Sequence, residues 1–222
     1  MMIIIFIVKD IFHTLLVMKS CKSCVESIDS IKPRIHKFRR DIILPVLFRM
    51  MYCCGMRPSE PLHLLTEDVD LNTGDIYLRQ TKKNKDRHII MSEDMRKLCL
   101  KYDSLVDQRQ WFFQREDGKP FDTNWMTKHF HICWDNSRLV KHGSPRPYDF
   151  RHAFATRNLI QWIDKGKDVM ALMPYLSTYM GHSELDSTFY YIHLLPDRLL
   201  KSAGIDWHQF DGIYGEVPAN ED

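Results

Sequence analysis

The sequence has no long, unbroken hydrophobic run, and this limits the classes of protein that it can encode. The most apolar stretch, at the N-terminus, is interrupted by Lys9, Asp10 and His13, so it is too broken to span a bilayer. It also lacks the basic start and the small-residue cleavage site of a signal peptide. We therefore expect no membrane partner, and we expect residues 1–28 to pack on the body of the protein in a role that the sequence leaves unclear.

The cysteines lack the spacing of a disulfide framework. There are six in 222 residues, and two of them, Cys53 and Cys54, are adjacent in an apolar run. This usage is typical of a reduced, cytoplasmic protein. Cys21 and Cys24 form a lone CxxC motif. Because no second pair stands at metal-ligand spacing, we favour a structural role over a zinc site.

An excess of charge of one sign is also missing, since the formal net charge is only +2. The total hides two basic stretches, residues 32–40 and 79–87, which carry five Lys or Arg each and are offset by an acidic C-terminal segment. For nucleic-acid binding, the distribution of charge matters more than its sum. Both stretches are candidates for phosphate contacts, and a solvated hairpin tip is the alternative interpretation of the second.

Neither an internal repeat nor an alternating strand–helix rhythm is present, and the missing rhythm argues against a parallel α/β sheet. Apolar patterning predicts helices over residues 39–54 and 123–139. It predicts a third helix that starts near Asp149, a residue type that caps helices well. It also predicts a β-hairpin over residues 75–91 and a short strand with a turn over 110–122. The fold class that we predict is α+β, mainly α-helical, with one small sheet.

Four motifs occur in an order that is typical of one family. They are GMRPSE (55–60), the basic hairpin TKKNKDR (81–87), YDFRHAFAT (148–156) and YMGHSELDSTFYYIH (179–193). Together they resemble the catalytic domain of the tyrosine recombinases, also called phage-type integrases, over roughly residues 29–200. The resemblance implies a DNA breaking-rejoining fold whose small antiparallel sheet carries a catalytic lysine.

The resemblance also assigns six candidate catalytic residues by their places in these motifs. They are Arg57, Lys82, Tyr148, Arg151, His182 and Tyr191. The family's nucleophilic tyrosine follows the histidine of the Gly-His pair by nine residues, which selects Tyr191 and leaves Tyr190 as a packing residue. Tyr148 stands where the family commonly has histidine, so its role is open. The segment between Arg151 and His182 is longer than in the simplest family members by about eight residues, a length that loops accept easily.

The chemistry of DNA strand transfer accounts for these residue types. Two arginines can hold a phosphodiester through their planar forks and stay charged at any working pH. Nearby cations lower the pKa of a tyrosine and favour the phenolate as nucleophile. A lysine on a hairpin can protonate the departing sugar oxygen, and His182 can donate a hydrogen bond to the phosphate. No Asp or Glu cluster is required, so we expect neither a metal nor a cofactor. By resemblance, the intermediate is a 3′-phosphotyrosine, and rejoining needs no ATP.

Each of these residues, taken singly, also has an ordinary structural interpretation. An arginine next to a proline, as Arg57 is, is usually solvated. An arginine in the first turn of a helix, as Arg151 is, normally faces water. A single histidine such as His182 more often has a structural role. The coincidence of type, order and spacing favours a site-specific recombinase or mobile-element integrase. A type IB-like topoisomerase and a non-catalytic DNA-binding remnant are the alternatives.

The resemblance carries expectations about partners and domains as well. The partner is double-stranded DNA, on which we expect a homo-oligomer, with residues 201–222 as a tail that docks on a neighbouring protomer. Family members usually carry a separate N-terminal helical domain that clamps the other face of DNA. About thirty residues precede the matched region, too few for such a domain.

Overall fold

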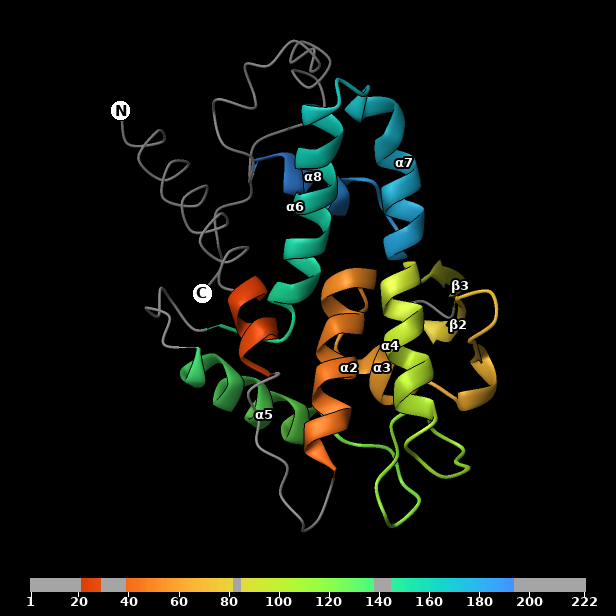
Figure 1. Cartoon of the computed structure of the whole chain (residues 1–222). Coiled ribbons are helices and arrows are strands. Elements are labelled where there is room, and N and C mark those ends of the chain that lie inside the picture. Colours follow the sequence, from red (N-terminus) through yellow and green to blue (C-terminus); the bar gives the residue numbers. More distant parts are fainter. Residues whose placement is uncertain (1–20, 29–38, 82–84, 138–144, 194–222) are drawn as a thin grey trace, which may run out of the picture.

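The computed structural model describes residues 21–28, 39–81, 85–137 and 145–193. Residues 21–28 are helical. The other elements are α2 (Arg40–Cys54), α3 (Ser59–Leu62), η1 (Thr66–Asp68), β1 (Val69–Asp70), β2 (Asp75–Thr81), β3 (Lys85–Ile90), α4 (Glu93–Asp103), α5 (Thr123–Asn136), α6 (Asp149–Asp164), α7 (Val169–Met180) and α8 (Asp186–His193). The arrangement is mainly helical with one small antiparallel sheet, which confirms the predicted α+β class (Figure 1). Lys82 and the predicted C-terminal tail lie outside the described residues.

Helix α2 is the centre of the larger hydrophobic core. It is buried along most of its length, and Phe48 at its middle contacts the rings of Phe130 from α5 and Phe150 from α6, at 6.0 and 5.7 Å between centroids. Residues 21–28 belong to the same core, because Cys21 and Cys24 are fully buried in it. The N-terminal segment that we expected to pack on the body does so over these eight described residues.

The sheet is a meander with the strand order β1-β2-β3. Strands β2 and β3 form the predicted hairpin, in which Ile76 pairs with Ile89 and Leu78 pairs with Arg87. Ile76, Leu78 and Ile89 are buried, so one face of the hairpin closes the core. Beyond Leu78 the register shifts, and the regular ladder ends before the tip.

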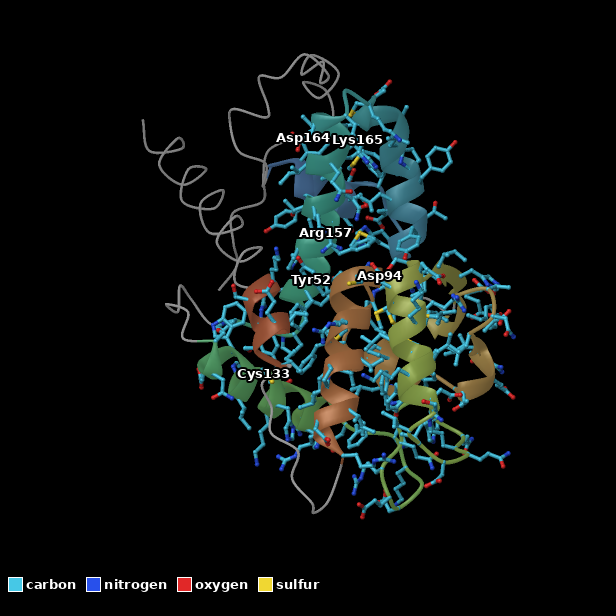
Figure 2. All side chains as sticks on the ribbon, viewed as in Figure 1. Tyr52, Asp94, Cys133, Arg157, Asp164 and Lys165 are labelled. Atoms are coloured by element: carbon cyan, nitrogen blue, oxygen red, sulfur yellow. The ribbon has the colours of Figure 1, made fainter. Side chains whose placement is uncertain are left out.

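A second hydrophobic cluster lies above the first in Figure 1, where α6, α7 and α8 pack together. Its buried residues are Phe154, Ala155, Leu159, Ile163, Val169, Met173, Leu176, Met180, Phe189, Tyr191 and Ile192. Helix α6 takes part in both clusters. Figure 2 shows Arg157 of α6 next to Tyr52 of α2, with the guanidinium 4.4 Å from the centre of the tyrosine ring.

Several local predictions can be compared with the observed backbone. Helix α2 ends where predicted, at Gly55, and Ser92 caps α4 by accepting from the amide of Met95. Asp149 is not the cap of α6 but its first residue, and its carboxylate accepts from the amide of Arg146. Within residues 110–122 the predicted short strand is wrong, because only two isolated bridges form there, whereas the predicted turn at Asp117 and Gly118 is present. The segment expected to hold extra residues before His182 forms α7 and the turn before it.

Candidate active site

Three helix ends meet at the junction of the two clusters: the C-terminal ends of α2 and α7 and the N-terminal end of α6 (Figure 1). Gly55 allows this approach. Its φ of 64° lies in the left-handed region, and a Cβ there would lie 2.5 Å from Cδ1 of Phe154 in α6. No side chain larger than that of glycine fits without a shift in its neighbours. The next residues place Arg57 between α2 and α3.

Arg57 is held in place by one carboxylate and one carbonyl. Its Nη1 donates to Oε1 of Glu60 at 2.9 Å, and its backbone amide donates to Oε2 of the same residue at 2.7 Å. Its Nη2 donates to the carbonyl oxygen of Gly181, at the end of α7. The side chain keeps 14% of its surface exposed. The guanidinium is therefore oriented by the protein and still reachable from solvent.

Arg151 is fully buried, which rules out the ordinary alternative that an arginine in the first turn of a helix faces water. Its Nη1 donates to the carbonyl of Gly55 at 2.7 Å, and its Nη2 donates to the carbonyl of Met180. Its Nε has no hydrogen-bond partner among the described residues. Burial, and then the charge of Arg57, lower the pKa of Arg151 from its usual value. Two cations held together in this way favour an anion between them.

His182 follows the glycine that ends α7. Its amide donates to the carbonyl of Ser177 at 3.0 Å, and its Nδ1 lies 2.6 Å from the hydroxyl of Thr188 in α8. Burial, and then the charges of Arg151 and Arg57, lower the pKa of His182 to about 4. The imidazole is therefore neutral at pH 7.

The two adjacent tyrosines of α8 have opposite environments. Tyr191 is 2% exposed, and its ring lies 6.2 Å from that of His182 and 5.5 Å from that of His152. Tyr190 is 54% exposed, so the prediction that it packs in the core is wrong. Burial raises the pKa of Tyr191, and the lowering by Arg151 does not offset this. The phenol is thus protonated in the DNA-free chain, in contrast to the phenolate that the nearby cations led us to expect.

Tyr148 stands at the N-cap position of α6, half-buried, with its ring 4.9 Å from that of His152 at an angle of 69°. Nδ1 of His152 is buried and has no hydrogen-bond partner within the described part of the chain. Burial lowers the pKa of His152, so it too is neutral at pH 7. The ring of His152 therefore lies close to the rings of both Tyr148 and Tyr191, at 4.9 and 5.5 Å between centroids.

Residues 25–198 match the phage integrase family. The chain is a member of this family. The tyrosine recombinase XerC of Halalkalibacterium halodurans is 30% identical over 164 residues, which are 69% of this chain and 50% of XerC. A putative integrase/recombinase of Sinorhizobium fredii, y4rE, is 28% identical over 170 residues, 74% of this chain and 55% of y4rE. The chain thus spans about half the length of the curated relatives that it matches.

Solved structures share the fold. The crystal structure of the XerA recombinase superposes with a TM-score of 0.65 at 24% identity, covering 88% of this chain and 63% of XerA. The XerH site-specific recombinase, in a post-cleavage complex with a palindromic difH substrate, gives a TM-score of 0.63 at 21% identity over 86% of this chain and 52% of XerH. The fold of this integrase family member is therefore that of the recombinases.

The structure brings together five of the six predicted site residues. They are Arg57, Tyr148, Arg151, His182 and Tyr191. The sixth, Lys82, stands in the sequence between β2 and β3 and is outside the described residues. Among the described residues, no three His, Cys, Asp or Glu side chains are grouped to hold a metal ion. Cys21 and Cys24 are buried free thiols. None of the described helices is long and apolar enough to cross a membrane.

Sequence reasoning assigned no role to three residues that the structure places at this site. Glu60, at the end of the first motif, accepts hydrogen bonds from both Arg57 and Arg87. Arg87 was counted only as one cation of the basic hairpin. Thr188, which contacts His182, stands three residues before Tyr191 in α8, and this spacing puts both on one face of the helix. That spacing could have identified Thr188 in advance.

Proposed function

We propose that this chain is a site-specific DNA recombinase or integrase that cleaves and rejoins DNA strands through a covalent bond to Tyr191. The observation that carries the proposal is the placement of Tyr191 against His182 and next to Arg151, at a point where Arg57 also converges. Membership of the phage integrase family supports it. The XerH relative is bound to its DNA substrate, which supports double-stranded DNA as the partner. A homo-oligomer on DNA and a cytoplasmic location belong to the same proposal.

The two arginines bind the scissile phosphate in this mechanism. Arg57 and Arg151 present guanidinium groups whose orientation is fixed beforehand by backbone carbonyls. Preorganised donors of this kind stabilise the charge that develops on the phosphate oxygens without having to reorganise. The Nε of Arg151 has no hydrogen-bond partner among the described residues, but it is buried, so the site has to open on DNA binding before this donor reaches the phosphate.

His182 supplies a further hydrogen bond to the phosphate. A neutral imidazole has one N–H, and the tautomer follows from the contact of the other nitrogen. We assign the Thr188 hydroxyl as the donor to Nδ1 of His182, which leaves the proton on Nε2. That N–H is then available to a phosphate oxygen.

Strand cleavage is a transfer of the phosphoryl group from the 5′ oxygen to a phenolic oxygen. The bond from Oη of Tyr191 to phosphorus forms, the bond from phosphorus to the 5′ oxygen breaks, and the phenolic proton leaves to water. Lys82, as general acid, protonates the departing oxygen. ATP does not enter this scheme, because the covalent link retains the free energy needed for rejoining. A metal does not enter it either, because Arg57 and Arg151 supply the positive charge at the phosphate. Since Tyr191 is almost completely buried, DNA binding has to bring α8 and the phosphate into contact.

The test is covalent capture on nicked DNA. A pool of duplexes with a randomised core and a nick that lets the 5′ product diffuse away is incubated with the chain, and adducts are separated on a denaturing gel. Peptide mapping of an adduct to Tyr191 supports the proposal, and sequencing of the captured DNA reports the preferred site. Absence of any adduct from folded protein that binds DNA would favour a non-catalytic remnant. Relaxation of supercoiled plasmids without sequence preference would favour topoisomerase activity.

A further inference from the structure

Thr188 presents a buried hydroxyl to the histidine that we expect to bind the phosphate. The residue is 0% exposed, and its Oγ1 lies 2.6 Å from Nδ1 of His182. In the part of the chain that the structure describes, this hydroxyl has no second hydrogen-bond partner. Buried polar groups are almost always hydrogen-bonded, so this one contact has to satisfy the hydroxyl.

The direction of the hydrogen bond follows from the burial of Thr188. If Nδ1 of His182 carried the proton and donated it, the hydroxyl hydrogen would be buried without an acceptor among the described residues. If the hydroxyl donates to Nδ1, both groups are satisfied, and the proton of the neutral imidazole is on Nε2. Thr188 thus favours one of the two tautomers of His182.

The main chain of His182 is held by a different helix from the one that holds its ring. Its amide donates to the carbonyl of Ser177 at 3.0 Å, and the amide of Gly181 donates to the carbonyl of Thr178 at 2.9 Å, both at the end of α7. The ring contacts Thr188, which belongs to α8. The direction of the ring therefore depends on how α8 is placed against α7.

The same helix carries the candidate nucleophile. Thr188 stands three residues before Tyr191, a spacing that puts both on one face of α8, and the ring of Tyr191 lies 6.2 Å from that of His182. Residues 183–187, which connect His182 to Thr188, are exposed, whereas Thr188 and Tyr191 are buried. The contact between histidine and helix is therefore made by these two side chains and not by the connecting segment.

We propose that Thr188 is a positioning residue, which holds His182 with its Nε2–H free for the phosphate and ties this histidine to the helix of the nucleophile. The inference deepens the proposed function and rests on it for its chemical consequence. Thr188 touches none of the reacting atoms in this scheme and acts through His182. The phosphate donor and the nucleophile are then set in place together, when α8 is docked.

The experiment compares Thr188→Val, Thr188→Ser and Thr156→Val with the parent chain. Valine matches threonine in shape and lacks the hydroxyl, whereas serine keeps the hydroxyl. Thr156 is the matched control, because it is also buried, at 1% exposed, and its hydroxyl has no hydrogen-bond partner among the described residues. Circular dichroism checks that each variant folds, and Thr188→Ala replaces Thr188→Val if the valine variant does not.

The first readout is the tautomer of His182 in the DNA-free chain. It is read at pH 7 from the ¹⁵N chemical shifts of the ring, with His182→Gln used to assign the signal. We expect the parent, Thr188→Ser and Thr156→Val to hold the proton on Nε2 and Thr188→Val to lose this preference. A parent chain with its proton on Nδ1 would overturn the inference, and so would a Thr188→Val variant with the same tautomer as the parent.

Hydrogen exchange of the peptide covering residues 185–192 tests the tie to α8. Thr188→Val should exchange faster than the parent, and Thr188→Ser and Thr156→Val should exchange like it. If Thr188→Val and Thr188→Ser exchange equally, the hydroxyl does not hold the helix and this half of the inference is wrong.

Cleavage of a nicked duplex gives the chemical consequence. We expect Thr188→Val to cleave at least about tenfold more slowly at unchanged DNA affinity, since losing a preorganised donor altogether costs about a hundred- to thousandfold. Thr188→Ser should recover most of the rate. Parent-like cleavage by Thr188→Val, or a loss that serine does not recover, would refute the positioning role. If the parent forms no adduct, only the proposed function fails, and the tautomer and the exchange still decide the role of Thr188.

Discussion

The rings of His182 and Tyr191 lie nearly parallel, at an angle of 14° and 6.2 Å apart. Adjacent residues on a helix point about 100° apart, so the neighbouring Tyr190 cannot share this position, and its ring faces solvent. The choice between the two tyrosines is therefore made by the direction in which α8 presents them.

We predict that Tyr191→Phe abolishes the covalent adduct and leaves folding and DNA binding intact. The substitution removes one oxygen and keeps the ring, so the contacts with His182 and His152 persist. Tyr190→Phe is the matched control and should still form the adduct. The measurement is the denaturing gel on nicked DNA, with binding followed separately by fluorescence anisotropy. An adduct that persists in Tyr191→Phe, or that maps to Tyr190, would refute the assignment.

Arg57→Ala and Arg151→Ala should both slow cleavage by about a hundred- to thousandfold, because each removes a preorganised donor to the phosphate. Their effects on stability should differ. Arg57 is partly exposed, and Glu60 keeps Arg87 as a partner when Arg57 is lost. Arg151 is fully buried and satisfies the carbonyls of Gly55 and Met180. Its removal leaves both acceptors and a cavity, which we expect to lower the free energy of unfolding by about 2–5 kcal/mol. Urea titration of both variants tests this, and equal midpoints would contradict it.

His182 should make stability depend on pH in the acidic range. Its pKa is about 4 in the folded chain against an ordinary value of 6.5, so between these values the unfolded state binds the extra proton. The stabilisation is complete above pH 6.5 and is lost as the pH falls, by up to about 1.4 kcal/mol per pH unit. His182→Gln should show a shallower decline between pH 6.5 and 5, measured by urea unfolding. Identical slopes would mean that His182 titrates as an ordinary surface histidine.

Gly181→Ala should destabilise the chain more than Gly166→Ala. Both glycines have φ values in the left-handed region, 66° and 62°, where alanine costs about 1 kcal/mol relative to glycine. Only at Gly181 does the added Cβ meet a neighbour, at 3.0 Å from Arg87, whereas the space around Gly166 is open. Thermal unfolding of the two variants isolates the clash from the backbone strain. A larger loss in Gly166→Ala would show that Arg87 yields readily.

Much of the site could be predicted because its residues stand in local motifs. Gly55 ends a helix and fixes where Arg57 emerges, a relationship that extends over a few residues and depends on helix geometry. The choice of Tyr191 over Tyr190 came from the resemblance, through the spacing from His182. The resemblance to a known family then joined the motifs in space.

The contacts between distant segments could not be predicted in the same way. Arg87 is one of five cations in a short stretch, and nothing in the sequence distinguishes it from Lys83 or Lys85; only the fold brings it to Glu60, 27 residues away. The wrong strand near residue 112 has a related cause. Phe112 and Phe113 are adjacent and both fully buried, so this segment enters the core without the alternating faces of a strand. The direction in which the pKa of Tyr191 shifts also depends on its burial, which the sequence did not reveal.

The burial of Arg151 has a consequence for how such a protein could lose its activity over time. Because this arginine joins the ends of α2, α6 and α7, a mutation that removes it impairs the folded domain together with its chemistry. In the proposed mechanism, mutation of Tyr191 to phenylalanine or of Lys82 stops the chemistry alone. A descendant that survives as a DNA-binding protein without cleavage should therefore retain Arg151 and show its first losses at the tyrosine or in the hairpin tip.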